Sequence, residues 1–191
     1  QWLIWITLRE APSEHLFARI CWRVCRGASA KQSRVPGAGK IARLGGGWVI
    51  GGLGMARYGA GNALTSGYQN VSVGRDAGGV LTTGLNNVSV GTNAGYNNVD
   101  GQQNTYVGTA SGYVSPGQNY NTFVGYESGH NNTANENTAV GRLSLHANTS
   151  GVRNTAIGTE SLKSNQTGDA NTALGYQSLF TTTGDRNIAI G

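Results

Sequence analysis

The sequence predicts an all-β fold, a parallel β-roll or β-solenoid built from 16–17-residue repeats. The first observation is a five-residue motif, Asn-x-x-(Val/Ile/Leu)-Gly, that occurs eight times at spacings of 16 or 17 residues. The second is composition: the chain has 31 glycines in 191 residues, and only 12% of its residues are charged. Such a composition can indicate disorder, but periodic glycines indicate a repeating structure instead.

The motif gives the repeat its numbering, and we count positions from its asparagine. The candidate structural residues are the first-position asparagine and the fifth-position glycine of each repeat: Asn70 and Gly74, Asn87 and Gly91, Asn104 and Gly108, Asn121 and Gly125, Asn137 and Gly141, Asn154 and Gly158, Asn171 and Gly175, Asn187 and Gly191. A partial repeat precedes them, because Ala60–Gly67 matches Ala77–Gly84, so the register begins near residue 58.

Each repeat is expected to contain short strands joined by glycine turns. A second glycine follows the first by about ten residues in most repeats, as at Gly84, Gly101, Gly151 and Gly168. We expect both glycines to supply turns with positive φ, and the β-branched columns between them to form strands. A helical repeat would show i, i+3, i+4 apolar spacing and few glycines. Eight stacked rungs about 4.8 Å apart would make a rod of roughly 40 Å.

Two columns carry predictions about the interior. The fourth position is apolar in all eight repeats, and we expect it to face inward: Val73, Val90, Val107, Val124, Val140, Ile157, Leu174 and Ile190. For the first-position asparagine two hypotheses stay open. Its side-chain amides can form a ladder along the stack, as in cross-β arrays, or it can hydrogen-bond a neighbouring turn.

The predicted core is thin. Each repeat offers only two or three good apolar side chains, which must offset the conformational entropy lost when 16–17 residues become ordered. Burial against other chains would add apolar contact that one chain lacks. We therefore predict a homo-oligomer.

The runs Asn154–Leu162 and Asn171–Leu179, with Thr167-Gly168 between them, resemble a known class of repeat. They are similar to the YadA-like head repeats of trimeric autotransporter adhesins and to related repeats of phage tail fibres and bacterial surface proteins. The resemblance covers about residues 58–191, although the period here is longer than in YadA heads. It implies a homotrimeric, non-enzymatic structural or adhesive fibre segment, extracellular, on a cell surface or on a virion. Its expected partner is a host-cell or matrix surface, through glycan or protein.

The chain divides into residues 1–54 and the repeat array of residues 55–191. The first segment holds eight Lys/Arg against Glu10 and Glu14, a net charge of +6, whereas the array holds six Lys/Arg against seven Asp/Glu, a net charge of −1. The basic segment is either an attachment region, helical over residues 14–26, or a stretch without a native role upstream of Met55. We expect no nucleic-acid partner, and no apolar run is long enough to insert in a membrane.

No catalytic, cofactor-binding or metal-binding site is predicted. Cys21 and Cys25 lack the second pair that would complete a zinc site, and four-residue spacing on a helix is poor disulfide geometry. His130 and His146 both occupy the tenth position, so they are either stacked groups that bind metal or sense pH, or solvent-facing polar residues. The aspartates Asp76, Asp100, Asp169 and Asp185 lie near turns without the pattern of calcium-binding β-rolls.

Further residues leave alternatives open. Tyrosines gather in the middle repeats, where they either stack on sugars or fill the surface: Tyr96, Tyr106, Tyr113, Tyr120 and Tyr126. Asn-x-Ser/Thr sequences at Asn70, Asn87, Asn131, Asn148 and Asn165 are expected incidentally in so polar a repeat. One alternative function is a monomeric β-solenoid with a glycan-binding face or an ice-binding face along the column Thr105, Thr122, Thr138, Thr155 and Thr172. The other is a tailspike polysaccharide depolymerase.

Overall fold

A computed structural model describes residues 41–44, 47–51, 60–61 and 63–191 of the chain. Ten strands form one sheet in sequence order. Strand β1 (Ile41–Leu44) is antiparallel to β2 (Gly47–Gly51), and β2 is parallel to β3, with Gly51 in register with Gly74. The helix expected over residues 14–26, together with Cys21 and Cys25, lies outside the described residues.

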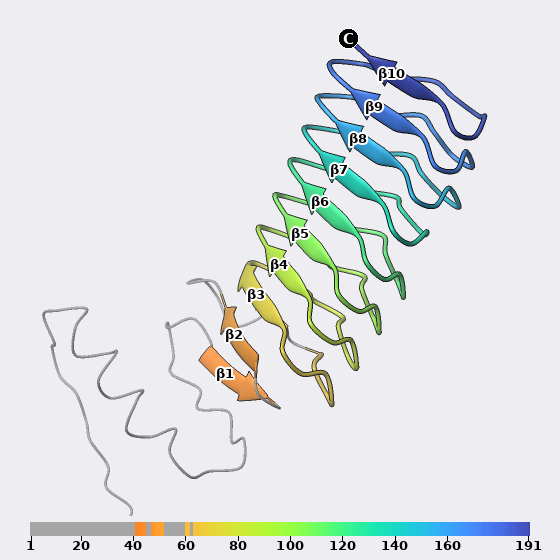
Figure 1. Ribbon diagram of the computed structural model, residues 1–191. Helices are drawn as coiled ribbons and strands as arrows, with labels where there is room; N and C mark the ends of the chain where they lie inside the picture. The colour runs from red at the N-terminus through yellow and green to blue at the C-terminus, as the bar shows by residue number, and fades with distance from the viewer. Residues whose placement is uncertain (1–40, 45–46, 52–59, 62) are drawn as a thin grey trace, which may run out of the picture. The chain divides into compact units, whose positions relative to one another are not determined.

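The repeats form a parallel coil, as predicted. Each of the eight repeats contributes one short strand, and every strand from β3 to β9 pairs in parallel with the strand of the next repeat (Figure 1). These strands are β3 (Val71–Gly74), β4 (Val88–Val90), β5 (Thr105–Val107), β6 (Thr122–Val124), β7 (Thr138–Val140), β8 (Thr155–Ile157), β9 (Thr172–Leu174) and β10 (Ile188–Ile190). The described array is therefore an all-β solenoid with one rung per repeat.

The strand side chains point inward at the third position and outward at the second and fourth. The third position is fully buried in β5 to β9, whereas the fourth reaches 36% exposure at Val140, 39% at Ile157 and 44% at Leu174. The prediction that the fourth column faces inward is therefore wrong. Side chains alternate across a strand, and the asparagine at the first position is buried, so the third position shares its side.

The first-position asparagines form a continuous ladder through the interior. The Oδ1 atom of each accepts the backbone N–H of the next asparagine along the stack, at 2.8–3.0 Å from Asn70 to Asn187. From Asn70 to Asn171, each Nδ2 atom also donates to a carbonyl 13 or 14 residues further on, as Asn154 does to Gly168 at 2.8 Å. The side chain thus links successive rungs and closes a turn of its own rung, so both hypotheses for this column describe part of its role.

The two glycines of the repeat serve different purposes. The fifth-position glycines have φ between +125° and +136°, as expected, in a region that L side chains rarely adopt. The second glycines do not have positive φ, so that prediction is wrong. A Cβ atom at Gly84 or Gly168 would instead collide with the backbone oxygen of the corresponding glycine in the next repeat. The second glycine permits close stacking rather than a special turn.

Left-handed backbone also occurs at residues that are not glycine. The seventh position, from Asp76 to Gln177, and the residue before each first-position asparagine have φ between +51° and +62°. The ninth position has φ near +57° where it is glycine and +48° to +50° where it is Leu145, Leu162 or Leu179. Non-glycine residues in this region carry a steric cost, which the regular stacking of the rungs must offset.

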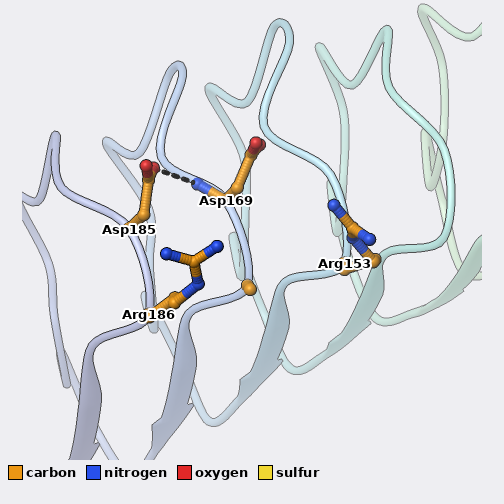
Figure 2. A pocket seen from close by; sticks show the side chains of 5 residues that line it. Arg153, Asp169, Asp185 and Arg186 are labelled. Atoms are coloured by element: carbon orange, nitrogen blue, oxygen red, sulfur yellow. Dashed lines mark hydrogen bonds between the residues drawn. The ribbon is translucent and has the colours of Figure 1, made fainter.

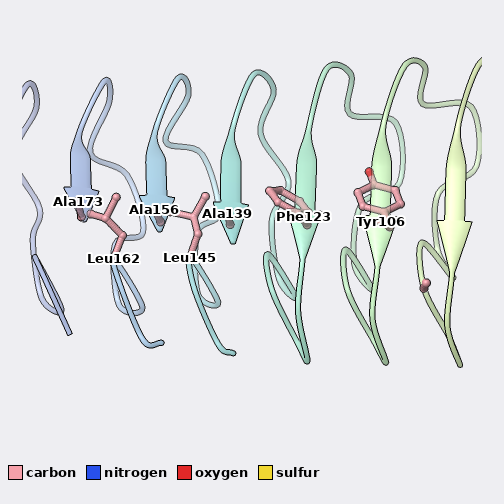
Figure 3. Close-up of a cluster of buried hydrophobic side chains, with 8 residues drawn as sticks. Tyr106, Phe123, Ala139, Leu145, Ala156, Leu162 and Ala173 are labelled. Atoms are coloured by element: carbon pink, nitrogen blue, oxygen red, sulfur yellow. The ribbon is translucent and has the colours of Figure 1, made fainter. Parts of the chain in front are cut away.

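Two different positions of the repeat supply the large side chain that fills the core, and which of them does so changes along the array. In the middle rungs the third position is Tyr106 or Phe123 and the ninth is glycine, whereas in the later rungs the third is alanine and the ninth is leucine. A Cβ atom at Gly129 would collide with the ring of Phe123. An aromatic ring on the strand therefore occupies the same space as a leucine from the turn, as Figure 3 shows for Tyr106, Phe123, Leu145 and Leu162.

We predict that Asn154→Ala destabilises the array strongly. The substitution leaves the buried backbone N–H of Asn171 without an acceptor, which costs about 1–3 kcal/mol. It also removes one of the two side-chain donors to the carbonyl of Gly168, which keeps its bond from Asn165. The free energy of unfolding in urea measures this loss. Asn131→Ala, at a half-exposed position outside the ladder, is the control and should change stability by less than about 0.5 kcal/mol.

We also predict that Phe123→Ala and Gly129→Leu compensate each other. Phe123→Ala alone opens a cavity that costs about 3–5 kcal/mol, and Gly129→Leu alone forces a side chain into the Phe123 ring. The double variant reproduces the composition of the next rung, Ala139 with Leu145. A double-mutant cycle should therefore show a large favourable coupling energy, and strict additivity of the two losses would contradict the exchange.

Candidate functional site

The second and fourth positions of the strands form a single surface of exposed and half-exposed side chains, which we call the outer face. It contains only Val, Ile, Leu and Thr: Val71, Val73, Val88, Val90, Thr105, Val107, Thr122, Val124, Thr138, Val140, Thr155, Ile157, Thr172, Leu174, Ile188 and Ile190. Eight rungs and two columns cover on the order of 400 Å². A continuous uncharged patch of that size is as large as the largest apolar patches of typical monomers, and these often mark interaction sites.

Charged side chains lie beside the outer face rather than on it. The sixth position, just beyond the first glycine, includes Arg75 and Arg142, and the residue before each first-position asparagine includes Glu136, Arg153 and Arg186. Arg142 and Arg153 are both exposed. The surface thus has a neutral centre and a polar border, which is the usual layout of a protein interface.

The tenth position forms a stack of rings on a different part of the coil. Tyr96, Tyr113, His130 and His146 lie one above another, with ring centroids 5.1–5.4 Å apart and interplanar angles of 8–16°. The column continues with Lys163, whose Nζ lies 5.4 Å from the Phe180 ring centroid. His130 therefore stacks on His146, the arrangement in the first of the two alternatives left open for these residues.

Glutamates border this stack. The Glu127 carboxylate lies 3.4 Å from Nε2 of His146, and Glu160 lies 3.1 Å from Nζ of Lys163. Burial lowers the pKa of His146 below its ordinary value, and the neighbouring His130 lowers it further, while Glu127 acts in the opposite direction. Glu160 also accepts a hydrogen bond from Gln177 at 2.9 Å, which is the main cause of its lowered pKa.

The structure separates the tyrosines into three groups. Tyr106 is fully buried, and its hydroxyl lies 2.9 Å from Oγ of Ser115 in the core. Tyr96 and Tyr113 stack on each other, so their facing ring surfaces are covered. Tyr120 and Tyr126 are exposed at 60% and 49%, and so are Tyr68 at 43% and Tyr176 at 66%, which lie outside the middle repeats. Among the tyrosines that the structure describes, only this last group offers open ring faces.

The aspartates play a structural part in the last repeats. Oδ1 of Asp169 accepts the backbone N–H of Val152, and Oδ1 of Asp185 accepts that of Asp169, each at 2.8 Å. Asn119 and Asn135 occupy equivalent positions, two residues before a first-position asparagine, and accept the same kind of bond. Asp169 and Asp185 line a shallow depression with Arg153 and Arg186 (Figure 2).

The remaining candidate residues are also used in the structure. Four of the five asparagines in Asn-x-Ser/Thr sequences, Asn70, Asn87, Asn148 and Asn165, are at most 2% exposed, and each Nδ2 donates to a carbonyl within the coil. Asn131 is half-exposed. Within the described ranges, no three His, Cys, Asp or Glu side chains gather closely enough to hold a metal ion.

Comparison with known proteins gives no family. No family model matches the chain, and neither a curated protein nor a solved structure matches it. Among the residues that the structure describes, no helix is long and apolar enough to span a membrane.

We predict that the array loses stability as the pH falls below about 6.5, the ordinary pKa of histidine. The pKa of His146 is lowered in the folded chain, so folding favours its neutral form. The contribution of His146 to the free energy of unfolding is complete above the pKa that the histidine has in the unfolded chain. It is lost as the pH falls toward the lower pKa that His146 has in the folded chain. Thermal unfolding between pH 8 and pH 5 measures the effect.

His146→Gln is the test of this assignment, because it removes the titrating ring and keeps a polar side chain. The melting temperature of the variant should depend less on pH over this interval than that of the unmodified chain. An identical pH profile in the two proteins would show that the dependence arises elsewhere.

Proposed function

We propose that the array is a non-enzymatic fibre segment whose outer face packs against two further copies of the same chain. The observation that carries this proposal is the unbroken run of uncharged side chains along all eight strands, with Val140, Ile157 and Leu174 more than a third exposed. A single chain would leave these β-branched and aliphatic groups in water. Packing between copies would remove them from it, a gain of about 25 cal/mol per Å² of apolar surface.

The composition of the interior supports an oligomer. Many of the buried side chains are Asn, Ser or Ala, and the largest apolar cluster relies on Tyr106, Phe123, Leu145 and Leu162. So small a core gives little apolar stabilisation per ordered residue. Association through the outer face would supply a second apolar layer.

The number of copies and the location follow from the resemblance to YadA-like head repeats and tail-fibre repeats. It favours a homotrimer that is extracellular, on a cell surface or on a virion, and that displays a receptor-binding surface to host or matrix glycan or protein. The described polar residues support a role without catalysis: the asparagines join the rungs, and Asp169 and Asp185 each commit an oxygen to a backbone N–H.

We predict that the chain is a trimer by light scattering behind size exclusion, and that Val140→Glu shifts it to monomer. Val140 is outside the core at 36% exposure, so a charge there is tolerated by the single chain. In the assembly the same substitution buries a carboxylate without a partner, which is strongly unfavourable.

Ser150→Glu is the matched control, because it adds the same charge at an exposed position outside the outer face. This variant should keep the mass of the unmodified protein. Equal behaviour of the two variants, or a folded monomer in the unmodified chain at every concentration, would refute packing through the outer face.

If light scattering shows a monomer, the ice-binding alternative becomes the better hypothesis, and one observation favours it. The column Thr105, Thr122, Thr138, Thr155 and Thr172 lies on the outer face at regular rung spacing, where it can order water. Thermal hysteresis in a freezing assay would support that function, and its absence would remove it.

A further inference from the structure

We propose that Tyr126 and Tyr176 are the two stacking platforms of a binding site for a linear polysaccharide that lies along the array. The inference deepens the proposed function, since it names the glycan class that the displayed surface would bind. It rests on that function only in requiring that the sixth-position column stay accessible in the assembled fibre.

The two tyrosines share a column and have open rings. Both occupy the sixth position, and they are 49% and 66% exposed. In the part of the chain that the structure describes, neither ring stacks on another aromatic ring, in contrast to Tyr96 and Tyr113. Sugars bind aromatic residues by laying their C–H bonds on the ring face, so an open face is the first requirement for such a site.

The spacing of the tyrosines suits an extended sugar chain. They are three repeats apart, so roughly 14 Å separates them along the stack at about 4.8 Å per rung. An extended β-linked polysaccharide advances by a similar distance per sugar residue as the coil does per rung. A chain parallel to the stack would therefore present one sugar to each ring, with further sugars over the intervening rungs.

Polar groups occupy the rungs between the rings. Arg142 and Thr159 fill the sixth position there, and the Arg142 side chain is 58% exposed while its Nη1 lies 3.4 Å from Glu160. Glu160 in turn accepts a hydrogen bond from Gln177, beside Tyr176. These donors and acceptors match sugar hydroxyl groups.

The experiment is affinity gel electrophoresis of the full chain in gels that contain hydroxyethylcellulose, mixed-linkage β-glucan, xylan or galactomannan. We expect retardation by at least one of them. Tyr126→Ala and Tyr176→Ala should each weaken the apparent affinity by roughly two- to tenfold, the range of a single aromatic contact, and the double variant by more.

Two controls separate stacking from other effects. Tyr120→Ala removes a tyrosine that is equally exposed, at 60%, but lies outside the sixth-position column, and it should bind as the unmodified chain does. Tyr126→Phe keeps the ring and should keep most of the affinity. Circular dichroism of each variant checks that the β-coil is intact.

The proposal is overturned if none of the four polysaccharides retards the chain, or if Tyr120→Ala weakens binding as much as the platform variants. The mass measurement above is independent of this result. A trimer that binds no polysaccharide would reject the two tyrosines as platforms and would still support the fibre. A monomer that binds through Tyr126 and Tyr176 would support the platforms and reject the trimeric fibre.

Discussion

The coil depends on one hydrogen bond, which the backbone N–H of each first-position asparagine donates to the side chain of the asparagine one repeat earlier. The carboxamide is buried in the interior, where Oδ1 accepts the following N–H and Nδ2 donates to a turn carbonyl. Asparagine can satisfy both groups, because its side chain has an acceptor and a donor on one short stem. Aspartate would lack the donor, and glutamine would displace both groups by one bond.

The ladder holds successive rungs close together, and this close stacking determines which residues can occupy the other positions of the repeat. The second glycine has no room for a Cβ atom against the next rung, as at Gly84 and Gly168. The space inside each rung is so small that one large side chain fills it, from the strand at Phe123 or from the turn at Leu162. The apolar residues that remain must face outward, and in this way a narrow interior produces an apolar exterior.

The periodicity of the sequence predicted the coil, because each repeat forms the same backbone hydrogen bonds. The motif that occurs eight times shows where along the chain these bonds form. It did not predict which side of the strand is buried. The fourth column is always apolar and therefore suggested a core, while the third column changes from Ser72 to Phe123 to Ala156. The missing signal was a correlation: the third position is large only where the ninth is glycine. The shared repeat position allowed His130 to lie over His146, but it left a solvent-facing arrangement equally open, because repeat position alone does not say how a side chain turns. Tyr176 was overlooked because it lies beyond the repeats where the other tyrosines cluster.

The regular ladder also makes the coil a molecular ruler. Distance along the axis is counted in repeats, so duplication of one 17-residue unit would lengthen the rod by about 4.8 Å without altering the contacts of any other rung. Gene segments that gain or lose whole repeats would thus change reach in equal steps. A duplication boundary between Phe123 and Gly129 would instead separate the third and ninth positions, which together fill the core of one rung. Boundaries that preserve the core therefore lie in the turns that precede each asparagine.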